Sequence, residues 1–297
     1  MLSEKISRAI GRIQQAHEIA SHMGNCLVLA YSGGKDSDVL LDLALKSGVT
    51  VSVQHNHTTA DAPETVYHIR DVFKLLDEKG IPAKINPPPV ITTADGKKAT
   101  ASMWNLIPKM GIPPTRVMRY CCEFLKERKF EGQHILTGIR WAESNNRANR
   151  GLHEKLHRVP KKRIVYMDEN EDVQKLTAIC QLRNRIATNP IIDWSNKEVW
   201  EYIRLNDIQM NPLYSNGYER IGCIGCPMSV NTPLELSRYP RYKAAYIRAF
   251  QKMIDVREQK GKENRGAFRD GVTVYRWWTE KRFNIDQLSL EDVYENL

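Results

Sequence analysis

A glycine turn early in the chain carries the residue types best suited to bind a phosphate group. Its residues are Tyr31, Ser32, Gly33, Gly34, Lys35, Asp36 and Ser37. An apolar segment precedes it and apolar residues at helical spacing follow it, which predicts strand, turn and helix. Glycine lets the backbone approach an anion, and the N-terminus of a helix offers free N–H groups and a favourable dipole. Lys35 adds a mobile positive charge, the serines add hydroxyl donors, and the spacing of a Walker A loop is absent.

Four of the six cysteines form a second group that could carry chemistry. Cys121 and Cys122 are adjacent, and Cys223 and Cys226 form a C-x-x-C pair farther along the chain. A C-x-x-C pair alone indicates zinc or a redox pair. Two adjacent cysteines reach one tetrahedral zinc only with strain but more easily reach two irons of a cubane, so the set favours a 4Fe-4S cluster over zinc or free thiols. The other two, Cys26 and Cys180, are interpreted as packing residues, with sulfur transport by Cys180 as the alternative.

A second candidate for phosphate binding follows the apolar segment 134–138. Gly138 would let the backbone approach a ligand, and Arg140 could hold two phosphate oxygens with its planar guanidinium. His55 and His57 follow the predicted strand 49–53, at the end of the sheet where ligands lie in doubly wound folds. We nevertheless interpret the two histidines as hydrogen-bonded loop residues.

An α/β framework must position these groups, and the periodicity of the chain predicts one. Helices are predicted over 1–24, 38–46, 63–79 and 196–205, and strands over 26–30, 49–53, part of 81–90, 134–138 and 189–194. Ser195 and Glu198 form a capping box at the start of the last helix. Residues 150–188 are polar and basic, which indicates an inserted hairpin. The fold class is therefore α/β, with a Rossmann-like parallel sheet flanked by helices and a basic helical C-terminal extension.

Positive charge is concentrated near the C-terminus of this 297-residue chain, whose net charge is +9. Thirteen Lys/Arg and five Asp/Glu lie between residues 236 and 282, so a phosphate-rich partner or a solvated helix face would each explain the segment. No apolar run reaches membrane-spanning length and the first twenty residues lack a secretory signal, so no membrane contact and a cytoplasmic location are expected. We predict a nucleotide-binding domain with the cysteines over 1–228 and a basic helical extension over 229–297.

The motif S-G-G-K-D-S in this setting resembles the PP-loop of ATP pyrophosphatases. Three further segments resemble PAPS and APS reductases and their phosphorothioation relatives: P-E-T at 63–65, T-G-x-R-x-x-E-S-x-x-R at 137–147, and C-C with a later N-P-L-Y and C-x-x-C. The resemblance implies a fold of the adenine nucleotide alpha-hydrolase type and ATP with Mg²⁺ as the ligand. It also implies nucleotide contacts from residues 31–37, Gly138 and Arg140, and a 4Fe-4S cluster on Cys121, Cys122, Cys223 and Cys226.

Two departures from the reductases favour one branch of this family. Assimilatory reductases carry a nucleophilic cysteine in a K-R-E-C-G tail, and here no cysteine follows Cys226. The glycine turn also has the form that handles ATP. The chain thus resembles the DNA phosphorothioation enzymes of the Dnd and Ssp systems, which implies that ATP activates a DNA phosphate for sulfur delivered by a cysteine desulfurase. In this interpretation Lys35, Asp36 and Arg140 are catalytic, and Asp36 helps to place Mg²⁺.

Other functions stay open at this point. An assimilatory sulfonucleotide reductase that releases sulfite would need an external thiol or Cys180. A non-catalytic nucleotide-binding scaffold is disfavoured because Lys35, Asp36 and Arg140 are all present. Charge alone does not separate DNA from RNA, so a tRNA thiolase is a variant of the first hypothesis. The oligomeric state is also open, with a homodimer as one option.

Overall fold

The computed structural model of this protein divides into two compact units. It describes residues 1–127, 134–156, 164–166, 185–229, 232–262, 264 and 268–280. The first unit comprises Met1–Asn56, Pro63–Asn86 and Lys129–Ile221, and the second comprises His57–Ala62, Pro87–Arg128 and Gly222–Leu297. Each unit is assembled from separated stretches of sequence, and the domain boundary predicted after residue 228 falls inside the second unit.

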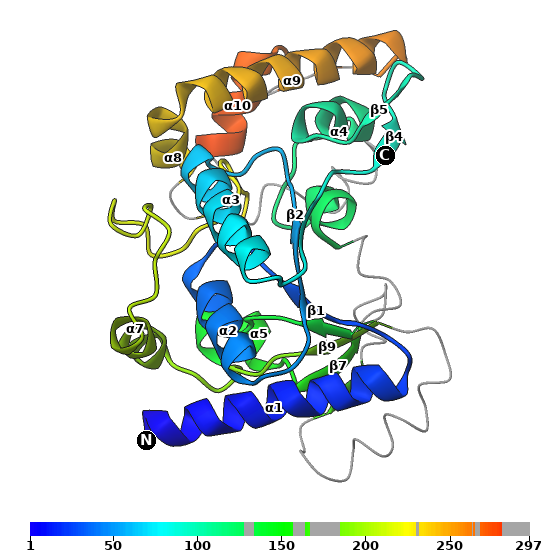
Figure 1. The fold of residues 1–297 in the computed structure, drawn as a ribbon. Coiled ribbons are helices and arrows are strands. Elements are labelled where there is room, and N and C mark those ends of the chain that lie inside the picture. Colours follow the sequence, from blue (N-terminus) through cyan, green and yellow to red (C-terminus); the bar gives the residue numbers. More distant parts are fainter. Residues whose placement is uncertain are drawn as a thin grey trace. The chain divides into compact units, whose positions relative to one another are not determined.

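The first unit is built on a mostly parallel sheet (Figure 1). Its described strands are β1 (Leu27–Ala30), β2 (Ser52–Asn56), β3 (Ala83–Asn86), β6 (His134–Leu136), β7 (His153–Leu156), β8 (Ile164–Tyr166) and β9 (Arg185–Thr188). They lie in the order β3-β2-β1-β6-β9-β7-β8, parallel from β3 to β9, with β7 antiparallel to both of its neighbours. This arrangement confirms the α/β, Rossmann-like expectation, and β7 with β8 forms the hairpin expected in the insertion.

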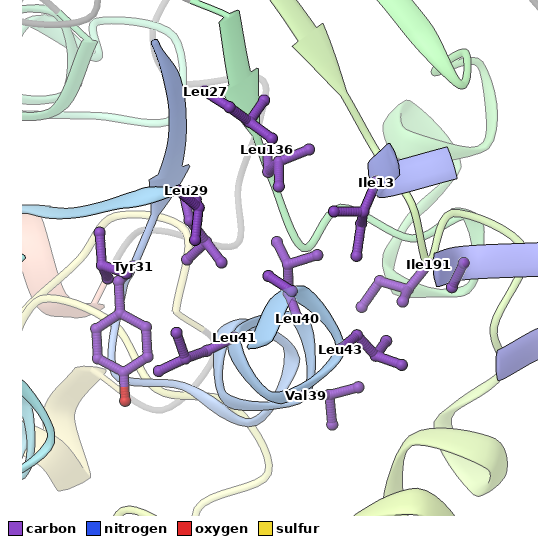
Figure 2. Packing of buried hydrophobic residues seen from close by; sticks show 14 of the residues in the cluster. Ile13, Leu27, Leu29, Tyr31, Val39, Leu40, Leu41, Leu43, Leu136 and Ile191 are labelled. Atoms are coloured by element: carbon purple, nitrogen blue, oxygen red, sulfur yellow. The ribbon is translucent and has the colours of Figure 1, made fainter. Parts of the chain in front are cut away.

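Helices of the first unit cover the sheet and explain why β1 is apolar throughout. These helices are α1 (Leu2–His22), α2 (Lys35–Lys46), α3 (Pro63–Glu78) and α7 (Asn196–Leu205). Leu27 and Leu29 of β1 enter a core with α1 and α2, whereas Val28 packs with Ile135 of β6. Figure 2 shows this core, including Ile13, Leu29, Leu40, Leu43 and Leu136. Burial of both faces of a strand removes the alternation of polar and apolar residues.

The strand predicted over 189–194 is wrong. The strand in this region is β9, which ends at Thr188, and the next residues form turns. In those turns Ile192 N donates to Asn189 O at 3.1 Å and Trp194 N donates to Ile191 O at 3.0 Å. The apolar side chains of this segment are buried without being in the sheet, because a short apolar run is compatible with any buried backbone.

The second unit is mainly helical and has an aromatic core. Its described elements are the hairpin β4 (Val90–Thr92) and β5 (Lys98–Thr100), and the helices α4 (Met103–Met110), η1 (Cys122–Glu127), α8 (Thr232–Arg238), α9 (Pro240–Gln259) and α10 (Gly271–Glu280). Tyr246 of α9 contacts Trp104 of α4 and Trp278 of α10, with ring centroids 4.9 and 4.8 Å apart. Trp278 Nε1 donates to Pro114 O at 2.7 Å, so Trp278 is a core residue. None of the described helices is both long and apolar enough to span a membrane.

Candidate active site

The predicted phosphate-binding turn lies where β1 ends and α2 begins. Gly33 has a φ of +70°, and a Cβ atom there would lie 2.8 Å from Ile69 Cγ1 of α3, so the position requires glycine. A Cβ atom on Gly138 would lie 2.9 Å from Asp36 O. The predicted close approach at Gly138 is therefore an approach to the backbone of the turn, which brings the two βα connections together.

Lys35 and Asp36 begin α2 and are held in fixed positions. Lys35 Nζ lies 3.5 Å from Asp36 Oδ2, and it also donates to Glu219 O at 3.3 Å. Asp36 Oδ1 accepts a hydrogen bond from Arg140 Nε at 2.7 Å. The three residues predicted to be catalytic thus form one connected ionic group, in which Asp36 remains partly exposed.

Arg140 faces protein groups with its whole guanidinium. The side chain is fully buried, with Nη1 donating to Trp194 O at 3.1 Å and Nη2 donating to Asn196 Oδ1 at 2.7 Å. Its complete burial leaves no exposed edge of the guanidinium for the bidentate phosphate contact predicted for this residue. In this geometry Arg140 orients the Asp36 carboxylate, and the fixed planar fork of arginine suits that task.

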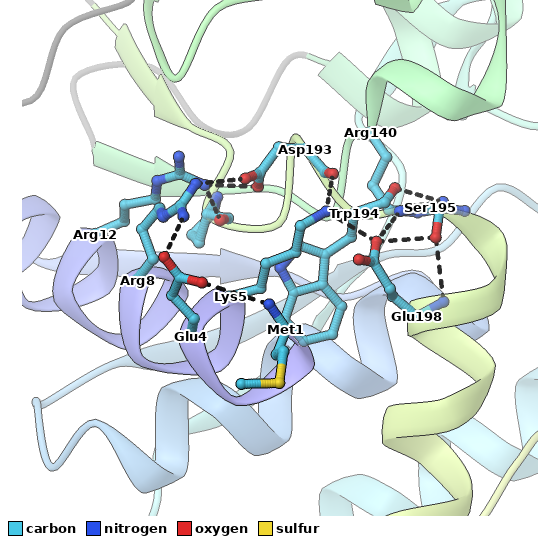
Figure 3. A network of polar contacts seen from close by, with 11 residues as sticks. Met1, Glu4, Lys5, Arg8, Arg12, Arg140, Asp193, Trp194, Ser195 and Glu198 are labelled. Carbon is cyan, nitrogen blue, oxygen red and sulfur yellow. Dashed lines mark hydrogen bonds and ion pairs between the residues drawn. The ribbon is translucent and has the colours of Figure 1, made fainter.

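Side chains of α1 form a polar network with the segment that accepts hydrogen bonds from Arg140 (Figure 3). Lys5 Nζ donates to Asp193 O at 2.7 Å and to Glu198 Oε2 at 2.9 Å. Arg12 Nη1 donates to Asp193 Oδ1 at 2.8 Å. The predicted capping box is present, because Ser195 Oγ accepts from Glu198 N at 3.3 Å and the Glu198 carboxylate accepts from Ser195 N at 2.7 Å. These contacts hold the 189–194 turn and the start of α7, which supply the carbonyl and amide oxygens for Arg140.

The segment that carries N-P-L-Y covers the glycine turn, which sequence reasoning treated only as part of a family pattern. Asn211 is fully buried and donates through Nδ2 to Gly33 O at 3.0 Å and to Thr65 Oγ1 at 3.1 Å. The Tyr214 hydroxyl accepts a hydrogen bond from Lys35 N at 2.9 Å. Both side chains therefore act directly on the predicted phosphate site.

The serine hydroxyls of the turn, and the buried residues Tyr31, Asp38 and His68, make further local contacts. Ser37 Oγ donates to Gly34 O at 2.7 Å and lies 3.2 Å from Ser32 Oγ. The Tyr31 hydroxyl donates to the Asp38 carboxylate, and His68 Nε2 lies 3.2 Å from Asp38 Oδ1. Burial, followed by the Asp38 charge, raises the pKa of Tyr31 well above its ordinary value. Tyr31 is therefore a neutral support for α2, and Asp38 and His68 are site neighbours that no motif signalled.

Other residues singled out in the sequence have simpler roles in the part of the chain that the structure describes. His55 lies in β2 and is buried, with Nδ1 3.0 Å from Tyr31 O, so the hydrogen bond expected for it is present but the loop position is wrong. Arg147 forms an ion pair with Glu143 within the short helical segment that follows Arg140. Cys26 is an exposed free thiol, so the packing role predicted for it is wrong. Cys180 lies outside the described residues.

The second unit contains all four predicted cluster ligands. The Cys121 thiol donates to Cys122, which raises the pKa of Cys121 and lowers the pKa of Cys122. Arg119 Nη2 donates to Cys122 Sγ at 3.3 Å, and this cation also favours the Cys122 thiolate. Cys223 and Cys226 each raise the pKa of Cys121 through their charge, so the four sulfur atoms interact electrostatically.

Cys223 is held by the short connection 57–62. Cys223 Sγ lies 3.3 Å from Thr58 Oγ1 and 3.9 Å from Asp61 Oδ1, and Asp61 forms an isolated β-bridge with Cys223. Burial raises the pKa of the Cys223 thiol to about 11, and the Cys223 charge raises the pKa of Lys126. Two cations beside four thiols suit an anionic thiolate centre, so the donor set fits a cluster in its chemistry. In the part of the chain that is described, however, no three His, Cys, Asp or Glu side chains are arranged to hold a metal ion.

The basic C-terminal segment places positive side chains on one face of α9. Arg241, Arg248 and Lys252 are exposed, and their spacing of seven and eleven residues returns them to the same side of the helix. Asp255 adds one negative charge on this side. We call Arg241, Arg248 and Lys252 the basic stripe.

Comparison with known proteins identifies the family. The phosphoadenosine phosphosulfate reductase domain matches residues 26–229, which include both the glycine turn and the four cysteines. The chain belongs to this family. An uncharacterised protein of Methanocaldococcus jannaschii is 27% identical over 301 residues, covering 99% of this chain and 61% of that protein. This member of the PAPS reductase family therefore spans about three fifths of that relative's length.

Two proteins with named activities are also similar to this chain. An adenosine 5'-phosphosulfate reductase of Oceanobacillus iheyensis is 24% identical over 224 residues, covering 74% of this chain and 77% of the relative. The crystal structure of a PAPS reductase from Candida auris is similar with a TM-score of 0.42 and 20% identity, covering 71% of this chain and 87% of that one.

Proposed function

We propose that this member of the PAPS reductase family cleaves ATP between its α and β phosphates and uses the activated intermediate to insert sulfur at a nucleic-acid phosphate. The observation that carries the proposal is the S-G-G-K-D turn, with its left-handed Gly33 and the Lys35–Asp36 pair at the start of a twelve-residue helix. Such a terminus stabilises anionic phosphate, and a neighbouring lysine adds to that effect.

The chemistry can be assigned to named groups. An oxygen of the nucleic-acid phosphate attacks the α-phosphorus of ATP and pyrophosphate leaves, while Lys35 and the N-terminus of α2 stabilise the charge on the departing group. Asp36, oriented by Arg140, helps to hold Mg²⁺ against the phosphate oxygens. A persulfide from a cysteine desulfurase then attacks the activated phosphorus, a P–S bond forms and AMP leaves. An external thiol cleaves the S–S bond that remains, which releases the phosphorothioate and leaves a mixed disulfide between that thiol and the desulfurase cysteine.

Two groups of the second unit support the same function. Cys121, Cys122, Cys223 and Cys226 would hold a 4Fe-4S cluster, which when bound would supply a site for sulfur or a structural centre. The basic stripe of α9 would bind the nucleic-acid backbone, and phosphate contacts of this kind do not distinguish DNA from RNA.

A second candidate function is sulfonucleotide reduction, which the name of the Oceanobacillus iheyensis relative favours. That reaction would take adenylyl sulfate or its 3'-phosphate and release sulfite. It would not require ATP.

The test is a product assay with anaerobically purified protein given ATP or adenylyl sulfate, with and without DNA or tRNA. AMP and pyrophosphate from ATP, stimulated by one nucleic acid, are expected. Lys35→Ala should abolish turnover, whereas Lys97→Ala, at an exposed lysine, should not. Pyrophosphate release that is unchanged in Lys35→Ala would refute the assignment. Sulfite from adenylyl sulfate with ATP untouched would select the reductase.

A further inference from the structure

Two phosphate-binding groups of Lys35 are already occupied by protein atoms. Its backbone N–H, in the first turn of α2, donates to the Tyr214 hydroxyl at 2.9 Å, and its ammonium donates to Glu219 O at 3.3 Å. Both acceptors belong to residues 211–219, which we call the covering segment. The same segment holds the turn through Asn211, whose Nδ2 donates to Gly33 O.

The Tyr214 hydroxyl occupies the position expected for an anion. It lies 3.3 Å from where a Cβ atom of Gly34 would be, so the absence of a side chain at Gly34 leaves room for an oxygen atom directly over the turn. N–H groups at a helix start bind phosphate or sulfate oxygens in this way. The tyrosine oxygen is neutral, since burial raises its pKa above the ordinary value, and it therefore satisfies the amide without supplying the negative charge that the site favours.

We propose that the covering segment is a displaceable plug of the phosphate site, in which the Tyr214 hydroxyl and the Glu219 carbonyl stand in for phosphate oxygens until a nucleotide displaces them. This inference rests on the proposed nucleotide function and adds a competing internal ligand to it. A di- or triphosphate can then bind only when both of these hydrogen bonds break, so the segment sets the nucleotide affinity.

The aromatic ring of Tyr214 has contacts that do not involve its hydroxyl. Trp200 of α7 packs edge-on against it with centroids 5.4 Å apart, and Lys35 Nζ lies 5.6 Å from its centroid. Tyr214→Phe therefore removes the competing oxygen and keeps the ring. Tyr202→Phe is the matched control, because the Tyr202 hydroxyl donates to Asp42 Oδ2 at 2.6 Å, elsewhere in the same unit.

The experiment measures binding of inorganic pyrophosphate and of ATP by calorimetry to the full chain and both variants. Tyr214→Phe should bind each ligand about 2- to 10-fold more tightly, the range that one net hydrogen bond contributes, and Tyr202→Phe should bind as the unchanged protein does. Equal or weaker binding by Tyr214→Phe overturns the plug, since weaker binding means that the hydroxyl donates to the phosphate. If the unchanged protein and Tyr214→Phe bind neither ligand, the proposed nucleotide function also fails.

Hydrogen exchange on the unchanged protein gives a second test that needs no variant. Pyrophosphate should slow exchange of the Lys35 amide and speed exchange of amides in residues 211–219, because the two hydrogen bonds from Lys35 to the segment break. Slower exchange in both places would overturn the plug, because it would mean that the segment closes on the ligand.

Discussion

Replacing Gly33 by alanine should destabilise the protein for two reasons, one conformational and one steric. The first is conformational, because a φ of +70° costs an L-residue about 1–2 kcal/mol. The second is steric. A Cβ atom there would lie 2.8 Å from Ile69 Cγ1, 3.1 Å from Ile69 Cδ1 and 3.2 Å from Thr65 Cγ2, and forcing atoms into a packed core costs about 1–3 kcal/mol. The sum predicts a loss of about 2–5 kcal/mol in the free energy of unfolding.

Gly48→Ala is the matched control for this prediction. Gly48 has a φ of +73° in the same unit, but nothing lies within 4 Å of where its Cβ atom would be. It should therefore cost only the conformational part, about 1–2 kcal/mol. Urea unfolding of both variants gives the difference, and calorimetry with ATP should show that affinity falls in Gly33→Ala and not in Gly48→Ala.

A third variant tests whether Ile69 is the obstacle. In an Ile69→Ala background the Cγ1 and Cδ1 atoms are gone, so the added cost of Gly33→Ala should fall towards that of Gly48→Ala. If Gly33→Ala and Gly48→Ala lose equal stability, the steric argument is refuted. An added cost that stays the same in the Ile69→Ala background would refute the role of Ile69.

Two other predictions concern the second unit. Cys122→Ser and Cys223→Ser should each lose iron and brown colour after anaerobic purification, whereas Cys26→Ser, at an exposed thiol, should retain both; full iron in either of the first two removes that cysteine from the ligand set. A second prediction replaces the basic stripe with glutamine at Arg241, Arg248 and Lys252. The slope of log affinity against log salt for duplex DNA should become less steep by about 0.9 for each phosphate that the protein no longer neutralises. The same change at the exposed Lys74, Lys79 and Lys84 should leave the slope as it was, and equal slopes for both triple variants would show that the stripe is only solvated.

Local features of the sequence were enough to predict the frame of the site. The apolar run before Tyr31, the two glycines and the helical spacing after Lys35 specify strand, turn and helix through contacts between near neighbours. The capping box of Ser195 and Glu198 is local in the same sense, because its hydrogen bonds span only three residues. The same reasoning failed for 189–194, where apolar composition alone cannot distinguish a buried turn from a strand.

The partners of the Arg140 guanidinium and of the Lys35 amide were decided by residues far away in the sequence. Arg140 has the right chemistry for phosphate, yet Asp36, Trp194 and Asn196 take up its guanidinium, and no pattern around residue 140 contains that information. The Lys35 amide is likewise taken by Tyr214, which lies 179 positions away along the chain. The sequence by itself therefore determined which residues could do chemistry and the local backbone that presents them. Only tertiary structure determined their partners, because a buried polar group must satisfy its hydrogen bonds with whatever the folded chain brings beside it.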